Sequence, residues 1–282
     1  MSNPEPMSDP ETPATGADPY IHGHDSSVVQ QHQRRTAEEA AAFLLPQLEP
    51  DMRLLDVGCG PGSITAGLGR HLPQGSVVGI EVVSDVLRSA QALIQEQAVE
   101  NIELAEASVY GLPFVDDGFD AAYAHQVLQH LAHPVDALRE MWRVVRPGGV
   151  VGVRDSDYGT MVSWPKSPSV IRFLELYHAV AEQAGGDADA GRRIPTWMRE
   201  AGFDDVTITT STWAFSDREG VQNWGFSWAE RTLRSAFAQQ AVELGLASTE
   251  ELESISAGWR AWAEDPDAFF TFVHVEAVGR VD

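Results

Sequence analysis

One short segment combines residue types that suit the binding of a small ligand. In LLDVGCGPGSIT, Asp56 is followed by Gly58, Gly60 and Gly62. Glycine allows a tight backbone turn and a close approach to a ligand, because it has no Cβ. We interpret the segment as a ligand-binding loop, and the alternative is a glycine-rich turn that binds nothing.

A carboxylate stands at a second informative position. Glu81 follows an apolar strand pattern in SVVGIEVV and precedes a helical pattern. A carboxylate at the end of such a strand can accept hydrogen bonds from both hydroxyls of a ribose. The alternative for Glu81 is an ordinary solvated charge.

The spacing G-x-G-x-G puts Ser63 where a dinucleotide fingerprint has its third glycine, which argues against a nicotinamide cofactor.

These residues belong to a region that alternates between strand and helix patterns. We predict strands at 53–59, 76–83, 101–108, 119–127 and 150–157, and helices at 63–72, 84–97 and 134–145. Such alternation with short links is typical of a parallel sheet covered on both faces. The prediction is an α/β fold with a doubly wound, mostly parallel sheet, which binds its ligand beyond the carboxyl ends of the strands.

Composition excludes several classes of protein. The 282 residues, 43% of them hydrophobic, can bury one large core. A formal net charge of −23 opposes non-specific binding to nucleic acid or anionic lipid. The single cysteine, Cys59, excludes an internal disulfide. No apolar run approaches the roughly 20 residues of a membrane span. We expect a cytoplasmic protein whose partner is a small molecule.

Several motifs together resemble those of class I S-adenosylmethionine-dependent methyltransferases. They are LLDVGCGPGSIT, Glu81, the LPF at 112–114, the run FDAAYAHQVLQH and the turn RPGG. The chain is most similar to the branch that contains the ubiquinone and menaquinone C-methyltransferases and many small-molecule methyltransferases. The resemblance covers residues 34–157. It implies a seven-stranded sheet with an antiparallel hairpin at one edge, and S-adenosylmethionine as the cofactor.

The resemblance also implies which residues bind the cofactor, namely Asp56, Gly58, Gly60, Gly62, Glu81, Val82, Ser108, Val109, His125 and Gln126. The glycine turn and Asp56 would hold the methionine part, and Glu81 the ribose. Ser108 and Val109 would meet the adenine edge, while His125 and Gln126 would lie near the sulfonium. Many relatives have an aspartate where this chain has Ser108, so the adenine amino group meets a weaker acceptor or a backbone carbonyl here.

The rest of the chain is expected to hold the substrate. Residues 205–282 would supply the last two strands, at 205–215 and 269–280, with a helical insertion at 216–266. A second insertion, at 160–204, follows the fifth strand. Both are rich in aromatic residues and are predicted to form a lid that excludes water. Trp164, Tyr177 and Trp228 are the candidate substrate contacts, and the alternative is that such residues fill the core of a small lobe.

The N-terminal region divides into a tail and a cap. Residues 1–19 are rich in Pro, Ser, Asp and Glu and are predicted to be disordered. Residues 20–50 are predicted to form a helical cap on the core at 51–159, with a helix at 34–45. In the enzymes that the chain resembles, such a helix folds over the cofactor. Tyr20 and His24 are therefore candidates to cover the methyl group.

Methyl transfer is an in-line displacement at a carbon bonded to positively charged sulfur. The protein chiefly positions and desolvates the reactants, and an acceptor that must lose a proton also needs a base. His125, His130 and Asp155 are the candidate bases, because they follow the fourth strand or end the fifth. A mechanism by proximity alone needs none of them, and no metal is predicted.

Three functions remain in competition. The first is methyl transfer to an oxygen or carbon of a small, apolar or aromatic metabolite. The second is a nicotinamide-dependent oxidoreductase, which Ser63 disfavours. The third is a non-catalytic relative that binds the cofactor only as a ligand. The acceptor and the oligomeric state are not predicted.

Overall fold

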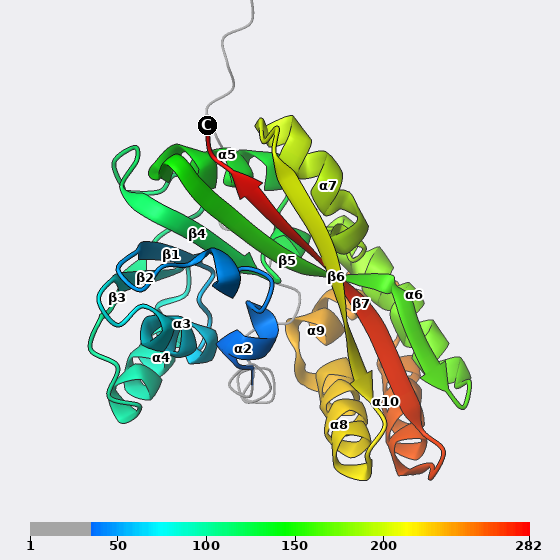
Figure 1. The fold of residues 1–282 in the computed structure, drawn as a ribbon. Coiled ribbons are helices and arrows are strands. Elements are labelled where there is room, and N and C mark those ends of the chain that lie inside the picture. Colours follow the sequence, from blue (N-terminus) through cyan, green and yellow to red (C-terminus); the bar gives the residue numbers. More distant parts are fainter. Residues whose placement is uncertain (1–34) are drawn as a thin grey trace, which may run out of the picture.

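A single seven-stranded sheet organises the computed structural model, which describes residues 35–282 (Figure 1). Its strands are β1 (Arg53–Val57), β2 (Ser76–Glu81), β3 (Ile102–Glu106), β4 (Phe119–His125), β5 (Val145–Trp164), β6 (Val206–Phe215) and β7 (Phe269–Arg280). They lie in the order β3-β2-β1-β4-β5-β7-β6. The first five strands are parallel, and β7 runs antiparallel to both β5 and β6. The prediction of a mostly parallel sheet with an antiparallel edge pair is confirmed.

Helices cover both faces of the sheet. They are α2 (Ala37–Ala40), α3 (Ser63–His71), α4 (Ser84–Glu96), α5 (Pro134–Val144), α6 (Pro168–Gln183), α7 (Ala190–Ala201), α8 (Arg218–Arg234), α9 (Ala236–Glu243) and α10 (Thr249–Glu264), with 3-10 turns η1 (Leu45–Gln47) and η2 (Leu128–His130). One core cluster joins the sheet to α5 and α7, and another joins it to α2 and α3. We call these the α7 face and the α2 face. Because side chains alternate along a strand, successive residues of β4 and β5 project to opposite faces.

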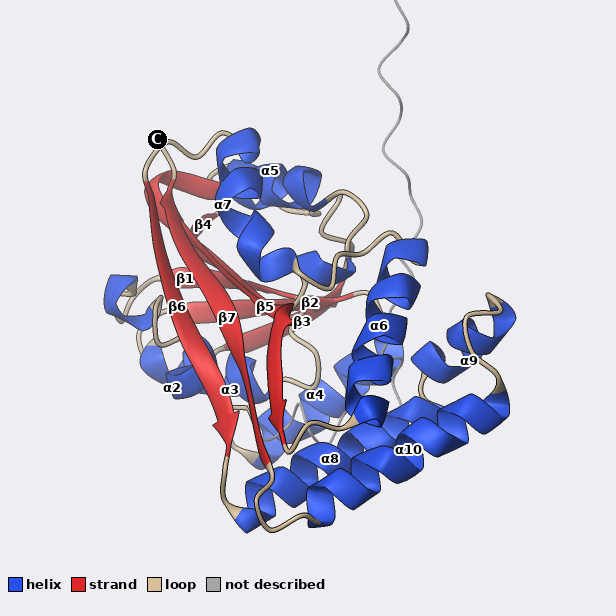
Figure 2. Ribbon diagram, turned by 90° about the vertical axis from the view of Figure 1, so that its right-hand side faces the viewer, coloured by secondary structure: helices blue, strands red, loops and turns tan. Residues whose placement is uncertain are grey.

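The fifth strand is longer than the sequence pattern predicted. β5 continues to Trp164, beyond the predicted end at residue 157, and pairs with β7 over this extension. Together with α6 and α8–α10, the extended strands build a second lobe (Figure 2). Residues 158–164, YGTMVSW, do not alternate regularly, and their partner β7 lies more than 100 residues away in sequence, so the local pattern did not indicate the extension.

The tryptophans of the second lobe form its core. Trp224, Trp228, Trp259 and Trp262 are buried, and their rings contact one another and neighbouring phenylalanines. Burying large aromatic side chains stabilises a small lobe because each removes a large apolar area from water. These tryptophans therefore fill the core of a lobe, which is the alternative to substrate contact. Trp224 also lines a cavity.

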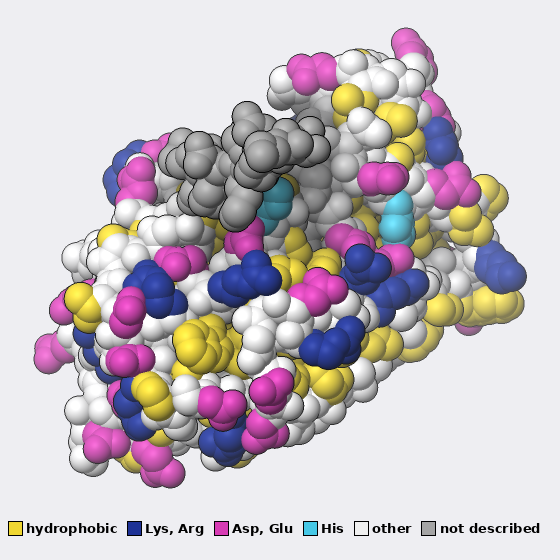
Figure 3. Space-filling model, turned by 90° about the horizontal axis from the view of Figure 1, so that it is seen from above, with side chains coloured by type: hydrophobic (Ala, Val, Ile, Leu, Met, Phe, Trp, Pro, Cys, Tyr) yellow, Lys and Arg dark blue, Asp and Glu magenta, His cyan; other side chains and the backbone are white. Residues whose placement is uncertain are grey.

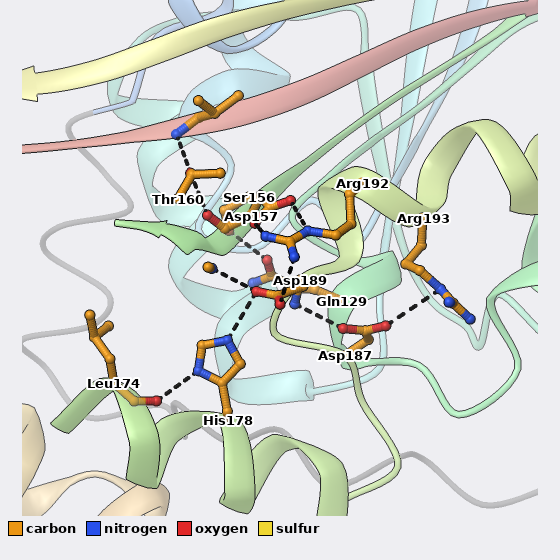
Figure 4. A network of polar contacts seen from close by, with 12 residues as sticks. Gln129, Ser156, Asp157, Thr160, Leu174, His178, Asp187, Asp189, Arg192 and Arg193 are labelled. Carbon is orange, nitrogen blue, oxygen red and sulfur yellow. Dashed lines mark hydrogen bonds and ion pairs between the residues drawn. The ribbon is translucent and has the colours of Figure 1, made fainter. Parts of the chain in front are cut away.

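The junction between the lobes is held by polar contacts (Figure 4). His178 of α6 contacts Asp189, with Nε2 2.9 Å from Oδ1, and Arg192 of α7 pairs with Asp157 of β5. The N–H of Asp187 donates to the carbonyl of Gln129, at 3.0 Å. These hydrogen bonds tie residues 187–189 to β5, α6 and η2.

The N-terminal cap is less helical than predicted. Instead of one helix at 34–45, the described part contains the single turn of α2, capped by the hydroxyl of Thr36, and then the 3-10 turn η1. Pro46 lies in η1, where it has no N–H to continue an α-helical ladder. Leu44 nevertheless anchors the cap, because its side chain packs against Gly152 of β5.

The face of the molecule in Figure 3 carries acidic and basic side chains that are interspersed. Within residues 35–282, no helix is long and apolar enough to cross a membrane.

Candidate active site

The glycine loop lies between β1 and α3, at the carboxyl edge of the parallel strands. Gly58 and Gly60 have φ angles of +66° and +53°, and Gly62 caps α3 with a φ of +84°. Among the atoms of residues 35–282, a Cβ on Gly60 would come no closer than 4.0 Å to another residue, so these residues leave space beside it. A Cβ on Gly58 would lie 2.6 Å from the Cγ2 of Val127. Gly58 is therefore required by packing, whereas Gly60 leaves room beside the loop.

Asp56 lies beneath this loop. It is buried, and its Oδ2 accepts a hydrogen bond of 2.7 Å from the hydroxyl of Thr65 in α3. Burial raises the pKa of the Asp56 carboxyl to about 7, the Thr65 bond opposes this, and the nearby charge of Glu81 adds to it. The predicted residues Asp56 and Glu81 are thus brought together, and Asp56 also fixes the start of α3.

The ends of β2 and β3 extend the same edge. Glu81 accepts a hydrogen bond from the N–H of Val82 at 2.8 Å, and Val82 is exposed. Ser108 follows β3 and is exposed, and its Oγ accepts from the N–H of Tyr110. Val109 is buried among core residues. Glu81, Val82 and Ser108 therefore lie at the carboxyl edge beside the glycine loop, while Val109 packs in the core of the α7 face.

The end of β4 contains a strained residue. Gln126 has a φ of +54°, which is unfavourable for a residue with a Cβ, and its N–H donates to the carbonyl of Arg154 at 2.7 Å. Its side-chain Nε2 lies 2.9 Å from the Nε2 of His274 in β7. Because the amide nitrogen can only donate, this His274 nitrogen is the acceptor. Backbone strain of this kind is concentrated at functional sites.

A row of polar side chains crosses the α2 face from β4 to β6. His125, Arg154, Glu276 and Thr209 occupy paired positions on β4, β5, β7 and β6. The guanidinium of Arg154 bonds Glu276 through Nε at 3.1 Å and the hydroxyl of Ser211 through Nη2 at 3.0 Å. Its Nη1 lies 3.4 Å from the Nδ1 of His125. Since the guanidinium can only donate, that Nδ1 is held as an acceptor.

The three candidate bases are not equivalent. The Nδ1 of His125 is occupied, because it accepts a hydrogen bond from the guanidinium of Arg154. His130 is buried, and desolvation together with the charge of Arg35 lowers its pKa to about 3, so it is a weak base. Asp155 is fully buried, and burial raises its pKa to about 8. However, Asp155 follows Arg154 in β5 and so projects to the α7 face, where its Oδ1 accepts from the N–H of Gln129.

A cavity of about 780 Å³ opens on the α2 face beside this polar row. Its wall is aromatic, with Trp213 and Phe215 from β6 and Trp224 and Phe226 from α8. Arg154 lines the cavity and connects it to His125 at the end of β4. The cavity therefore borders the carboxyl edge on which the glycine loop and Glu81 lie.

The candidate substrate contacts lie elsewhere. Tyr177 and Trp228 are buried in the core of the second lobe, and their contact with a substrate stays a prediction. Trp164 is 59% exposed at the far end of β5, ten residues beyond Arg154. Arg154 pairs with Glu276 and Trp164 with Phe269, seven residues apart along β7. Seven strand residues span roughly 23 Å, so Trp164 is too distant to contact an acceptor beside Arg154. Tyr20 and His24 lie outside the described residues.

The sequence reasoning missed Arg35, Arg154 and Trp213, which line the cavity, and His274 and Glu276, which contact Trp213 and Arg154. One signal was present. Arg154 and Glu276 are opposite charges within two largely apolar strand patterns. Buried charges are paired, so two such strands are expected to be neighbours in the sheet.

Comparisons with known proteins agree with this geometry. Residues 55–153 match the family model described as methyltransferase domain. An uncharacterized methyltransferase of Schizosaccharomyces pombe is 31% identical over 89% of this chain and 92% of its own length. A demethylmenaquinone methyltransferase of Roseiflexus castenholzii is 29% identical over 55% of this chain and 69% of its own.

A solved structure shares the fold. The phosphoethanolamine N-methyltransferase 2 of Haemonchus contortus, in complex with phosphomonomethylethanolamine and S-adenosylhomocysteine, has a TM-score of 0.54. It is 15% identical over 87% of this chain and 53% of its own length. The whole-length similarity to a methyltransferase, the matching domain and the strand order lead to one assignment. The chain belongs to the class I S-adenosylmethionine-dependent methyltransferases.

Proposed function

We propose that this enzyme transfers the methyl group of S-adenosylmethionine to an oxygen or carbon of a small, apolar or aromatic metabolite. The observation that carries the proposal is the cavity on the α2 face, which has an aromatic wall and borders the end of β4. A volume of about 780 Å³ is in the range of small-molecule sites.

The cofactor would lie along the carboxyl edge. The open space beside Gly60 and the carboxylate of Glu81 at the end of β2 fit an elongated molecule with a ribose. Ser108 would border the adenine, and the backbone at His125 and Gln126 would approach the sulfonium. When bound, the cofactor supplies an activated methyl group. The residues of the chain would orient it and keep water from the acceptor.

The acceptor would then approach from the cavity. Trp213 lines the cavity and also contacts the end of β4. Its ring centroid lies 4.5 Å from that of His274 and 6.4 Å from that of His125. An indole at this point can hold a planar acceptor against the end of β4, where methyl transfer would occur.

Turnover with isotope-labelled cofactor against a panel of small phenols, enols, amines and aliphatic alcohols tests the proposal. We expect labelled product from oxygen or carbon acceptors of aromatic character. Trp213→Ala should raise KM for the acceptor at least tenfold while cofactor affinity changes little. Trp142→Ala, on the outer side of α5 and away from the cavity, is the matched control. Transfer only to amines, or equal kinetics of both variants, would overturn the proposal.

The competing functions predict other results. A nicotinamide-dependent oxidoreductase would bind NADH, and calorimetry should detect no such binding here. A non-catalytic relative would bind S-adenosylhomocysteine without turnover on any acceptor of the panel.

A further inference from the structure

Two arginines converge on one indole at the inner end of the cavity. The guanidinium carbons of Arg35 and Arg154 lie 5.3 Å and 5.4 Å from the ring centre of Trp213. Both side chains line the cavity, and they are its cationic side chains among the described lining residues. Arg154 is only 1% exposed, so its charge acts in a poorly solvated place where electrostatic effects are strong.

The carboxylates of the cavity are placed differently. Glu38 and Glu39 of α2 are exposed, and Glu230 of α8 is half-buried. They lie toward solvent, whereas Arg154 lies on the sheet beneath them. The cavity therefore has an acidic rim, while its floor carries the two guanidiniums and one carboxylate, Glu276, which pairs with Arg154. A ligand that already carries a full negative charge is disfavoured at the rim.

Within residues 35–282, few groups around the floor could take a proton. The charged or titratable groups are Tyr123 and His125 from β4, His130 from η2, Arg154 from β5, His274 and Glu276 from β7, Arg35, Glu38 and Glu39 from the N-terminal cap, and Glu230 from α8. Glu276 is engaged by Arg154, Ser211 and Thr209. Burial and the charges of Arg154 and Arg35 lower the pKa of His274 well below its ordinary value.

From this arrangement we infer that the acceptor is a neutral weak acid, a phenol or an enol, which is ionised at the floor of the cavity by Arg35 and Arg154 and not by a protein base. The inference rests on the proposed function and names its substrate class. The acceptor hydroxyl loses its proton to solvent, and the guanidinium charges stabilise the oxyanion. A lone pair of that oxygen then forms the bond to the methyl carbon while the carbon–sulfur bond breaks, and its electrons pass to sulfur, which becomes neutral.

The direct test is the ionisation of a bound chromophoric phenol, with protein saturated by S-adenosylhomocysteine so that no transfer takes place. 4-Nitrophenol and larger nitrophenols serve as probes, because the phenolate absorbs at longer wavelength than the phenol. We expect the pKa of the bound probe to fall by at least one unit relative to the free probe. Absence of saturable binding by every probe, or an unchanged pKa, would overturn the inference.

Variants of Arg35 separate the electrostatic effect from a structural one, and they leave the Arg154–Glu276 pair intact. Arg35→Gln should remove at least half of the shift, whereas Arg35→Lys should retain most of it. Arg139→Gln on α5, which makes the same change in net charge at an exposed site, should not alter the shift. Equal shifts in Arg35→Gln and the wild type would exclude the role of Arg35.

Two further measurements distinguish this inference from the proposed function. Nitrobenzoates of the same ring size should bind at least tenfold more weakly than the nitrophenols, and equal or tighter binding would contradict the charge argument. The second measurement is the pH profile of kcat/KM for a series of substituted phenols. The apparent pKa of its acidic limb should follow the solution pKa of each phenol. A limb that stays fixed across the series indicates a protein base and refutes the inference, while methyl transfer itself would stand.

Discussion

Arg154 and Glu276 form an ion pair inside the sheet, with Nε and Oε1 3.1 Å apart and side chains 1% and 7% exposed. The pair joins β5 to β7 and lies between the end of β4 and the cavity. Its cation reaches His125 on one side and Ser211 on the other. Thus the end of β4 and the wall of the cavity share one buried guanidinium.

This pair leads to a prediction about stability. Glu276→Gln should lower the free energy of unfolding by about 3–5 kcal/mol, because it leaves the Arg154 charge buried without its counter-ion. The double variant Arg154→Met/Glu276→Leu should recover most of that loss. Urea denaturation of the single and double variants is the measurement. Equal stability of Glu276→Gln and the wild type would show that the buried cation is compensated elsewhere.

The glycine loop permits a comparison between two neighbouring positions. Gly58→Ala should cost about 2–4 kcal/mol, because it combines a left-handed backbone with a contact 2.6 Å from Val127. Gly60→Ala should lower the free energy of unfolding by only about 1–2 kcal/mol, because its sole penalty is the left-handed backbone conformation. Thermal unfolding gives both values, and Val127→Ala should restore part of the stability of Gly58→Ala but none to Gly60→Ala.

Glu81 supplies a test of cofactor binding. Glu81→Ala should weaken the binding of S-adenosylhomocysteine by about 2–3 kcal/mol, since it removes charge-assisted hydrogen bonds to the ribose. Glu103→Ala, an exposed residue on β3 with the same charge change, is the control. Calorimetry that returns the same dissociation constant for Glu81→Ala and Glu103→Ala would remove Glu81 from the site.

Asp155 should make stability depend on pH. Burial raises its pKa from an ordinary 3.8 to about 8, so the folded state binds a proton that the unfolded state releases in this interval. Its contribution to stability is complete below pH 3.8 and is lost as the pH rises to about 8, by up to about 1.4 kcal/mol per pH unit.

The variant Asp155→Asn should therefore show a flatter fall in stability between pH 5 and 8. Part of the fall should remain, because the pKa of Asp56 is also raised, to about 7. Chemical denaturation across this range is the measurement, with the exposed Asp136→Asn as control. Parallel curves for Asp155→Asn and the wild type would contradict the buried, protonated state of Asp155.

Much of the fold and of the cofactor edge could be predicted from local sequence. Alternating apolar strands and helices, joined by short links, specify a parallel sheet because few other arrangements bury both faces of such strands. The glycines and Glu81 could be placed at the carboxyl edge because each directly follows a strand, and the structure brings them together there.

The acceptor side was decided by tertiary structure. Arg35, Arg154 and Trp213 come from three distant parts of the chain and meet only because β7 inserts between β5 and β6 and brings β6 to the cavity. The same pairing extends β5 and turns Tyr177 and Trp228 into core residues. Local periodicity carries information about which face of an element is buried, but not about its partner. Long-range strand pairing therefore determined which aromatic residues fill the second lobe and which line the cavity.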